Sequence, residues 1–138
     1  MGKKVELACI IDDDKIYVNL VKKIIEIKQL AEKLLVYKNG REALDYFKNI
    51  METTTDEDKI PDIIFLDLNM PVMDGWEFLN EFIKIKNNLR KKITLYVVSS
   101  SIDQKDLERA KSFNLVTDYL IKPIELKKFE KIFDKTAA

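Results

Sequence analysis

The sequence contains no histidine and a single cysteine, Cys9. Without histidine, the chain cannot use that side chain as a general acid or base, as a metal ligand or as a phosphorylated residue. One cysteine cannot form a disulfide within the chain or a cysteine-rich zinc site. We therefore expect Cys9 to be a small apolar side chain of the core.

Glycine and long apolar runs are also scarce. The three glycines, Gly2, Gly40 and Gly75, lie too far apart to form the glycine-rich loop of a dinucleotide-binding protein. No apolar run approaches the roughly 18 residues of a membrane span, and the acidic residues 12–14 end the first apolar segment too early for a signal peptide. Positive and negative side chains balance at 24 each, which argues against a general attraction to nucleic acid or anionic membranes. We expect one cytoplasmic domain over residues 1–138, with no output domain and no direct contact with nucleic acid or membrane.

Five short apolar segments predict strands, because each is bounded by polar or turn-forming residues. They span residues 5–11, 34–37, 63–66, 93–98 and 116–121. Apolar residues at helical spacing predict five helices; the last covers residues 124–135, and the first carries Ile16, Leu20, Val21, Ile24, Ile25 and Ile27. The alternation of strands and helices predicts an α/β fold, in which a parallel sheet is covered by helices on both faces.

Capping residues predict where helices begin. Asp14 is placed to cap the first helix. Three further helices are preceded by a polar residue with a Glu or Gln three positions later, the spacing of a capping box. These pairs are Asn39 with Glu42, Asp74 with Glu77, and Ser101 with Gln104.

Polar side chains stand at the ends of four predicted strands. Asp12 and Asp13 follow the first strand, Asp67 the third, Ser99 the fourth and Lys122 the fifth. A lone aspartate at a strand end more often caps a turn. The carboxyl ends of parallel strands, however, share one edge of the sheet, where open α/β sheets bind their ligands. We therefore expect these side chains to meet in one crevice.

The chemistry of such a crevice follows from its residue types. Clustered carboxylates raise one another's pKa unless a cation joins them, and oxygen ligands without histidine or cysteine suit Mg²⁺ or Mn²⁺. A carboxylate can also act as a nucleophile and accept a phosphoryl group. Lys122 and the hydroxyl of Ser99 would then donate to the phosphoryl oxygens. These residues fit an acidic pocket that accepts a phosphoryl group.

The chain resembles the receiver domain of bacterial two-component response regulators, of the stand-alone chemotaxis-receiver type. The resemblance covers nearly the whole chain. It rests on Asp12–Asp13, on Asp67 within the segment FLDLNMPVMDGW, on Ser99, on Tyr119 and on Lys122–Pro123. It implies a flavodoxin-like, doubly wound sheet of five parallel strands in the order 2-1-3-4-5, with five helices on its two faces.

The resemblance also implies a role for each matching residue. Asp67 would be the phosphoacceptor, and Ser99 and Lys122 would bind the phosphoryl group. Mg²⁺ or Mn²⁺ would be held by Asp12, Asp13, Asp67 and the backbone carbonyl of Asn69. Ser99 and Tyr119 would form the switch, with Pro123 as a supporting residue. The implied partners are a sensor histidine kinase or a histidine phosphotransfer protein, and a downstream protein that binds the face of the fourth helix, fifth strand and fifth helix.

Two alternatives stay open. A haloacid-dehalogenase-like phosphatase also uses an aspartate nucleophile with Mg²⁺, but it needs a second aspartate two residues later, where this chain has Asn69. Its nucleophile also lies on the first strand rather than the third. A degenerate receiver would bind partners without phosphorylation, which the complete set of site residues argues against. We expect a signalling receiver rather than an enzyme.

Overall fold

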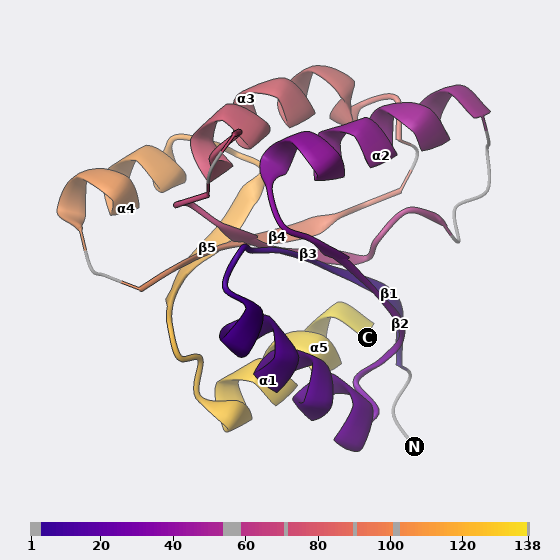
Figure 1. The fold of residues 1–138 in the computed structure, drawn as a ribbon, viewed down its shortest axis with the longest axis vertical. Coiled ribbons are helices and arrows are strands. Elements are labelled where there is room, and N and C mark those ends of the chain that lie inside the picture. The colour runs from indigo at the N-terminus through magenta and orange to yellow at the C-terminus, as the bar shows by residue number, and fades with distance from the viewer. Residues whose placement is uncertain (1–3, 54–58, 71, 90, 101–102, 138) are drawn as a thin grey trace.

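The computed structural model describes residues 4–53, 59–70, 72–89, 91–100 and 103–137. Within these ranges five strands alternate with five helices along the chain (Figure 1). In order, they are β1 (Val5–Ile11), α1 (Lys15–Ile27), β2 (Ala31–Tyr37), α2 (Gly40–Thr53), β3 (Ile63–Asp67), α3 (Gly75–Lys86), β4 (Thr94–Ser99), α4 (Gln104–Lys111), β5 (Val116–Ile121) and α5 (Leu126–Ala137). None of the described helices is long and apolar enough to cross a membrane.

The strands form one parallel sheet in the order β2-β1-β3-β4-β5. β3 lies at its centre, and all five of its residues are buried. A strand covered on both faces needs apolar side chains in both directions, which explains the unbroken apolar run before Asp67. The predicted fold class, and the strand order that the resemblance implied, are confirmed.

Helices cover both faces of the sheet. α1 and α5 lie on one face, and α2, α3 and α4 lie on the other (Figure 1). Successive strand residues point to opposite faces, so β3 contributes to two cores. Ile64 and Leu66 pack in the core with α2 and α3, whereas Ile63 and Phe65 pack in the core with α1 and α5. Cys9 is fully buried in the first of these cores, as expected.

The predicted caps of the first three helices are present. The side chain of Asp14 accepts hydrogen bonds from the backbone N–H groups of Ile16 and Tyr17, both at 3.1 Å. The side chains of Asn39 and Asp74 accept from the backbone N–H groups of Glu42 and Glu77, each at 2.9 Å. These caps fix where the chain turns from a strand end into the next helix.

The start of α4 differs from the prediction. Its N-cap is Asp103, whose side chain accepts a hydrogen bond from the backbone N–H of Lys105 at 2.9 Å. The predicted capping residue, Ser101, lies outside the described residues. Asp103 is itself a favoured N-cap residue. Two polar candidates, two positions apart, were thus available, and the spacing to Gln104 favoured the wrong one.

Several boundaries also differ. β2 begins at Ala31, three residues before the predicted strand, because polar Glu32 and Lys33 are tolerated on an edge strand. β4 begins and ends one residue later than predicted, and α5 begins and ends two residues later.

Fewer apolar residues of α1 are buried than their helical spacing predicted. Its buried residues are Val18, Val21 and Ile25. Ile16, Leu20 and Ile27, which the spacing assigned to the same apolar set, are exposed.

Candidate functional site

Four strand ends meet at one edge of the sheet, as the sequence predicts. Asp12 follows β1, Asp67 and Ser99 are the last residues of β3 and β4, and Lys122 follows β5. Asp12, Asp67 and Ser99 are buried, and the Lys122 side chain is only 12% exposed. Buried ionisable groups destabilise a fold unless they are paired. Their concentration at this edge of the sheet therefore marks it as the candidate functional site.

Three carboxylates converge there. One carboxylate oxygen from each of Asp12, Asp13 and Asp67 lies within 4.8 Å of the others. Asp12 and Asp67 are buried, and Asp13 is exposed at the rim. A set of hard oxygen donors, open to solvent on one side and free of nitrogen and sulfur ligands, fits a Mg²⁺-type or Mn²⁺-type cation.

Lys122 stands next to this cluster. Its Nζ lies 2.7 Å from Oδ2 of Asp12 and 3.9 Å from Oδ2 of Asp67. It also lies 4.5 Å from the centre of the Tyr17 ring. The ammonium is therefore held closer to the first carboxylate than to the second.

The pKa of Asp67 is raised to about 6. Burial is the largest cause, and the charge of Asp12 adds to it. The Lys122 ammonium and the backbone N–H of Asn69, 3.5 Å from Oδ1 of Asp67, act in the opposite direction. Desolvation and a like charge favour the protonated acid, so a cation at the cluster would favour the ionised form of Asp67.

Backbone contacts hold the cluster in place. Oδ1 of Asp12 accepts a hydrogen bond from the backbone N–H of Asp14 at 2.9 Å. The backbone N–H of Gly75 donates to the carbonyl of Leu68 at 3.0 Å. A Cβ atom at Gly75 would lie 2.5 Å from the carbonyl oxygen of Asp67. Only glycine therefore lets the start of α3 approach the end of β3 this closely.

The two predicted switch residues lie on adjacent strands. Ser99 is buried at the end of β4. Tyr119 is half-buried on β5, pairs in register with Val97 and packs against the core beneath α2 and α3. Pro123 follows Lys122 directly. The structure thus places Ser99 at the crevice and the Tyr119 side chain beside a core.

Sequence reasoning missed a second group of contacts. Trp76, at the start of α3, stacks on Phe113 with ring centroids 6.1 Å apart. The Arg109 guanidinium of α4 lies over the same indole at 4.5 Å. Neither Trp76 nor Phe113 carries a sequence signal for this contact, and Phe113 lies just after α4. These contacts join α4 to the helix that starts beside Asp67.

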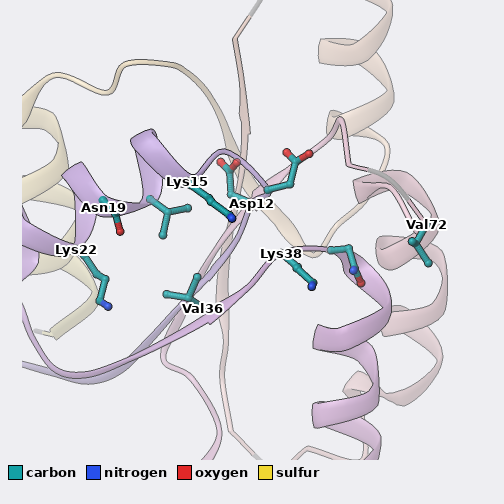
Figure 2. Close-up of a pocket in the computed structure, with 10 residues that line it drawn as sticks. Asp12, Lys15, Asn19, Lys22, Val36, Lys38 and Val72 are labelled. Carbon is teal, nitrogen blue, oxygen red and sulfur yellow. The ribbon is translucent and has the colours of Figure 1, made fainter.

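A cavity of about 550 Å³ opens beside Asp12 and Asp13. Figure 2 shows Lys15, Asn19 and Lys22 of α1 on one side of it, and Val36 and Lys38 on the other. An anion that approaches the carboxylates from this side meets three lysines first. Their positive charge offsets part of the repulsion from the acidic cluster.

The comparisons with known proteins agree with this arrangement. A family model for the response regulator receiver domain matches residues 8–134. Sensor histidine kinase CheAY of Helicobacter pylori is 37% identical over 97 residues, which cover 70% of this chain and 11% of CheAY. Chemotaxis protein CheY of Thermotoga maritima is 28% identical over 125 residues, which cover 91% of this chain and 89% of CheY.

A solved structure shows the same fold. The crystal structure of a two-component response regulator from Cytophaga hutchinsonii superposes with a TM-score of 0.84 at 26% identity, covering 97% of this chain and 98% of that one. The sheet order is that of a flavodoxin-like receiver. By the match of the family model to nearly its whole length, the chain belongs to the response regulator receiver domains.

Proposed function

We propose that the chain accepts a phosphoryl group on Asp67 from a sensor histidine kinase or a histidine phosphotransfer protein. The observation that carries this proposal is the convergence of the Asp12, Asp13 and Asp67 oxygens within 4.8 Å, with the Lys122 ammonium beside them. Receiver domains in general exchange phosphoryl groups with such partners. The donor histidine lies outside this sequence, which contains none.

The transfer is a substitution at phosphorus. A carboxylate oxygen of Asp67 forms the new O–P bond as the P–N bond of the donor phosphohistidine breaks, and the electron pair of that bond stays on the imidazole. Lys122 moves from Asp12 toward the phosphoryl oxygens, and the Ser99 hydroxyl donates to them. Both groups lie within the crevice before the reaction, so each has only a short distance to move.

The metal fits the same residues. Asp12, Asp13, Asp67 and the backbone carbonyl of Asn69 would hold Mg²⁺ or Mn²⁺, which supplies positive charge to the oxygens of the group being transferred. The donor set supports this assignment, since all three side-chain ligands are carboxylates.

The signal leaves by a change of surface. Phosphorylation adds roughly −1.5 to −2 charge units to the crevice, and Ser99 shifts toward it. Tyr119 on the neighbouring strand then turns into the space behind Ser99, which changes the face of α4, β5 and α5 for a downstream protein. Receiver domains are generally signalling modules rather than enzymes, and we place the chain in the cytoplasm without direct contact with nucleic acid or membrane.

Two competing functions have less support. A haloacid-dehalogenase-like phosphatase lacks its second aspartate here, because the residue two positions after Asp67 is Asn69. A degenerate receiver has no need of three converging carboxylates and a paired lysine, and the buried charges of Asp12, Asp67 and Lys122 are costly.

The test is labelling with a small phosphoryl donor, such as phosphoramidate, in the presence of Mg²⁺. The parent should take up one acid-stable, base-labile phosphoryl group, because an acyl phosphate is cleaved by base. Asp67→Asn should take up none and keep its circular dichroism spectrum, whereas the surface variant Asp45→Asn should label like the parent. Equal labelling of Asp67→Asn would place the nucleophile elsewhere.

A further inference from the structure

Tyr17 is the one aromatic residue that meets the ammonium of Lys122 among the contacts of the described residues. It belongs to the first turn of α1, where its backbone N–H donates to the Asp14 cap at 3.1 Å. The position of the Tyr17 backbone is therefore fixed by the Asp14 cap, which directly follows Asp12 and Asp13. The half-buried ring of Tyr17 lies under Nζ of Lys122 at 4.5 Å from its centroid, within the range of a cation–π contact.

The ring completes a niche for a buried charge. Lys122 has Asp12 at 2.7 Å and Asp67 at 3.9 Å, and the face of Tyr17 forms a further side. An ammonium withdrawn from water needs a partner on each side that it would otherwise show to solvent. The electron-rich face of an aromatic ring provides one without adding a net charge to the crevice.

The ring is held from behind. Tyr17 packs against the core of α1 and α5 and borders a small apolar groove with Leu20, Pro123 and Ile124. Burial and the charges of Asp12, Asp67 and Asp14 raise the pKa of its phenol. The ring therefore stays neutral at physiological pH and keeps an attractive face toward the ammonium.

The distances from Lys122 Nζ to the two carboxylates are unequal, and this difference suggests a role for the Tyr17 ring. Lys122 is bound more closely to Asp12, yet phosphoryl transfer requires it at the oxygens on Asp67. A hydrogen bond to Asp12 is lost as the ammonium moves, whereas attraction to a ring face changes little over a short slide. The aromatic contact can thus persist while the anionic partner changes.

We propose that Tyr17 is a positioning residue that holds the Lys122 ammonium between Asp12 and Asp67 through its ring face, so that the ammonium can reach a phosphoryl group on Asp67 without leaving the crevice. This inference rests on the function proposed above for Asp67 and Lys122. Tyr17 acts only through Lys122 and touches no reacting atom. The aromatic face is what matters, and the hydroxyl is dispensable.

The first test compares rates of labelling by phosphoramidate with Mg²⁺ in the parent, Tyr17→Leu and Tyr17→Phe. Tyr17→Leu keeps an apolar side chain for packing and loses the ring, so labelling should slow by roughly 2- to 30-fold, the range expected for losing a cation–π contact. Tyr17→Phe should stay within about twofold of the parent. Tyr46, another half-buried tyrosine but on α2, provides the matched control, and Tyr46→Leu should label at the parent's rate.

The second test needs no phosphorylation. Protons on Cε of Lys122 should show an upfield ring-current shift by nuclear magnetic resonance in the parent and in Tyr17→Phe, and should lose it in Tyr17→Leu. A parent that takes no label on Asp67 would overturn the proposed function, while the ring-current shift would still test the contact. Labelling of Tyr17→Leu at the parent's rate, labelling of Tyr17→Phe as slow as that of Tyr17→Leu, or absence of the shift in the parent would each overturn the role of Tyr17.

Discussion

The carboxyl group of Asp67 has the Lys122 ammonium 3.9 Å away, and its pKa is nevertheless raised to about 6. Burial is the largest cause, and the charge of Asp12 adds to it. Lys122, whose nearer partner is Asp12 at 2.7 Å, lowers this pKa but does not cancel the rise. A cation at the cluster, or a phosphoryl group that draws Lys122 away from Asp12, changes this balance.

The raised pKa predicts how the stability of the metal-free protein depends on pH. Between the ordinary pKa of 3.8 and the folded value of about 6, the folded state binds more protons than the unfolded state. The free energy of unfolding of the parent should therefore fall as the pH rises through this window. A shift of this size corresponds to about 3 kcal/mol, and solvent access to the crevice reduces the expected loss to roughly 1–2 kcal/mol.

Urea unfolding between pH 4 and pH 7, in the presence of a chelator, measures this effect. Asp67→Asn cannot titrate at this position, so its stability relative to the parent should rise with pH over the same window. Asp45→Asn, which changes an exposed carboxyl group on α2, should run parallel to the parent. Parallel profiles for the parent and Asp67→Asn would show that the pKa is not raised.

At the level of elements, α4 is the most weakly anchored helix. It has eight residues, all of them described, and only Ala110 among them is buried. The indole of Trp76 supplements this contact by meeting Arg109 and the following Phe113. Trp76 directly follows Gly75, which touches the backbone of Asp67 and Leu68, so one side chain links the site to α4.

Replacing Trp76 should therefore loosen α4 selectively. A stacked aromatic pair and a cation–π contact together contribute about 1–2 kcal/mol. In Trp76→Leu, exchange of the α4 backbone amides with deuterium should accelerate by about 5- to 30-fold, while the amides of α1 keep their protection. Ile83→Ala, at an exposed position of the same helix α3, should leave α4 unchanged. Exchange in α4 that is equal in the parent and Trp76→Leu would show that the stack does not hold this helix.

The elements that could be predicted from the sequence are those specified by residues within the element or directly beside it. The run Ile63–Leu66, the cap Asp14 and the pair Asp74–Glu77 each carry their own signal, and each lies where expected. The start of β2 was wrong because an edge strand tolerates polar residues such as Glu32. Whether an edge forms there depends on the whole sheet rather than on the segment.

The residues of the site also divide into those that the sequence could predict and those that it could not. Residues at strand ends were predictable because parallel strands must bring their carboxyl ends together. Tyr17 was not, since an aromatic residue at helical spacing reads as an ordinary core position. Its contact with Lys122 depends on how α1 packs beside the end of β5.

For the whole molecule, folding assembles the acidic cluster from residues that are far apart in sequence. Asp12 and Asp67 are separated by most of the first half of the chain, and their carboxylates approach each other only when β1 pairs with β3. The unfolded chain lacks this convergence, so Mg²⁺ should bind the folded state alone. A ligand that binds only the folded state stabilises it by mass action.

Mg²⁺ at ten times its dissociation constant should raise the free energy of unfolding by about 1.4 kcal/mol, which corresponds to a rise of roughly 2–6 °C in the thermal midpoint. Asp13→Ala should abolish the rise, and should slightly stabilise the metal-free protein by removing a repelling charge. Asp45→Ala serves as a control for the loss of a surface carboxylate, and differential scanning calorimetry measures all three proteins. An unchanged response to Mg²⁺ in Asp13→Ala would exclude that residue as a ligand.

The close approach of Gly75 to Asp67 limits which residues can replace this glycine during evolution. Any side chain at position 75 begins with a Cβ atom 2.5 Å from the carbonyl oxygen of Asp67 and 2.9 Å from Cα of Leu68, and both are backbone atoms that cannot rotate away. All nineteen replacements share that atom, so none is conservative. A survey of functional variants would therefore show glycine alone at position 75, although glycine contributes no side chain to the site. Asp67→Asn should keep the fold, whereas Gly75→Ala should distort the backbone at the end of β3, where Asp67 lies.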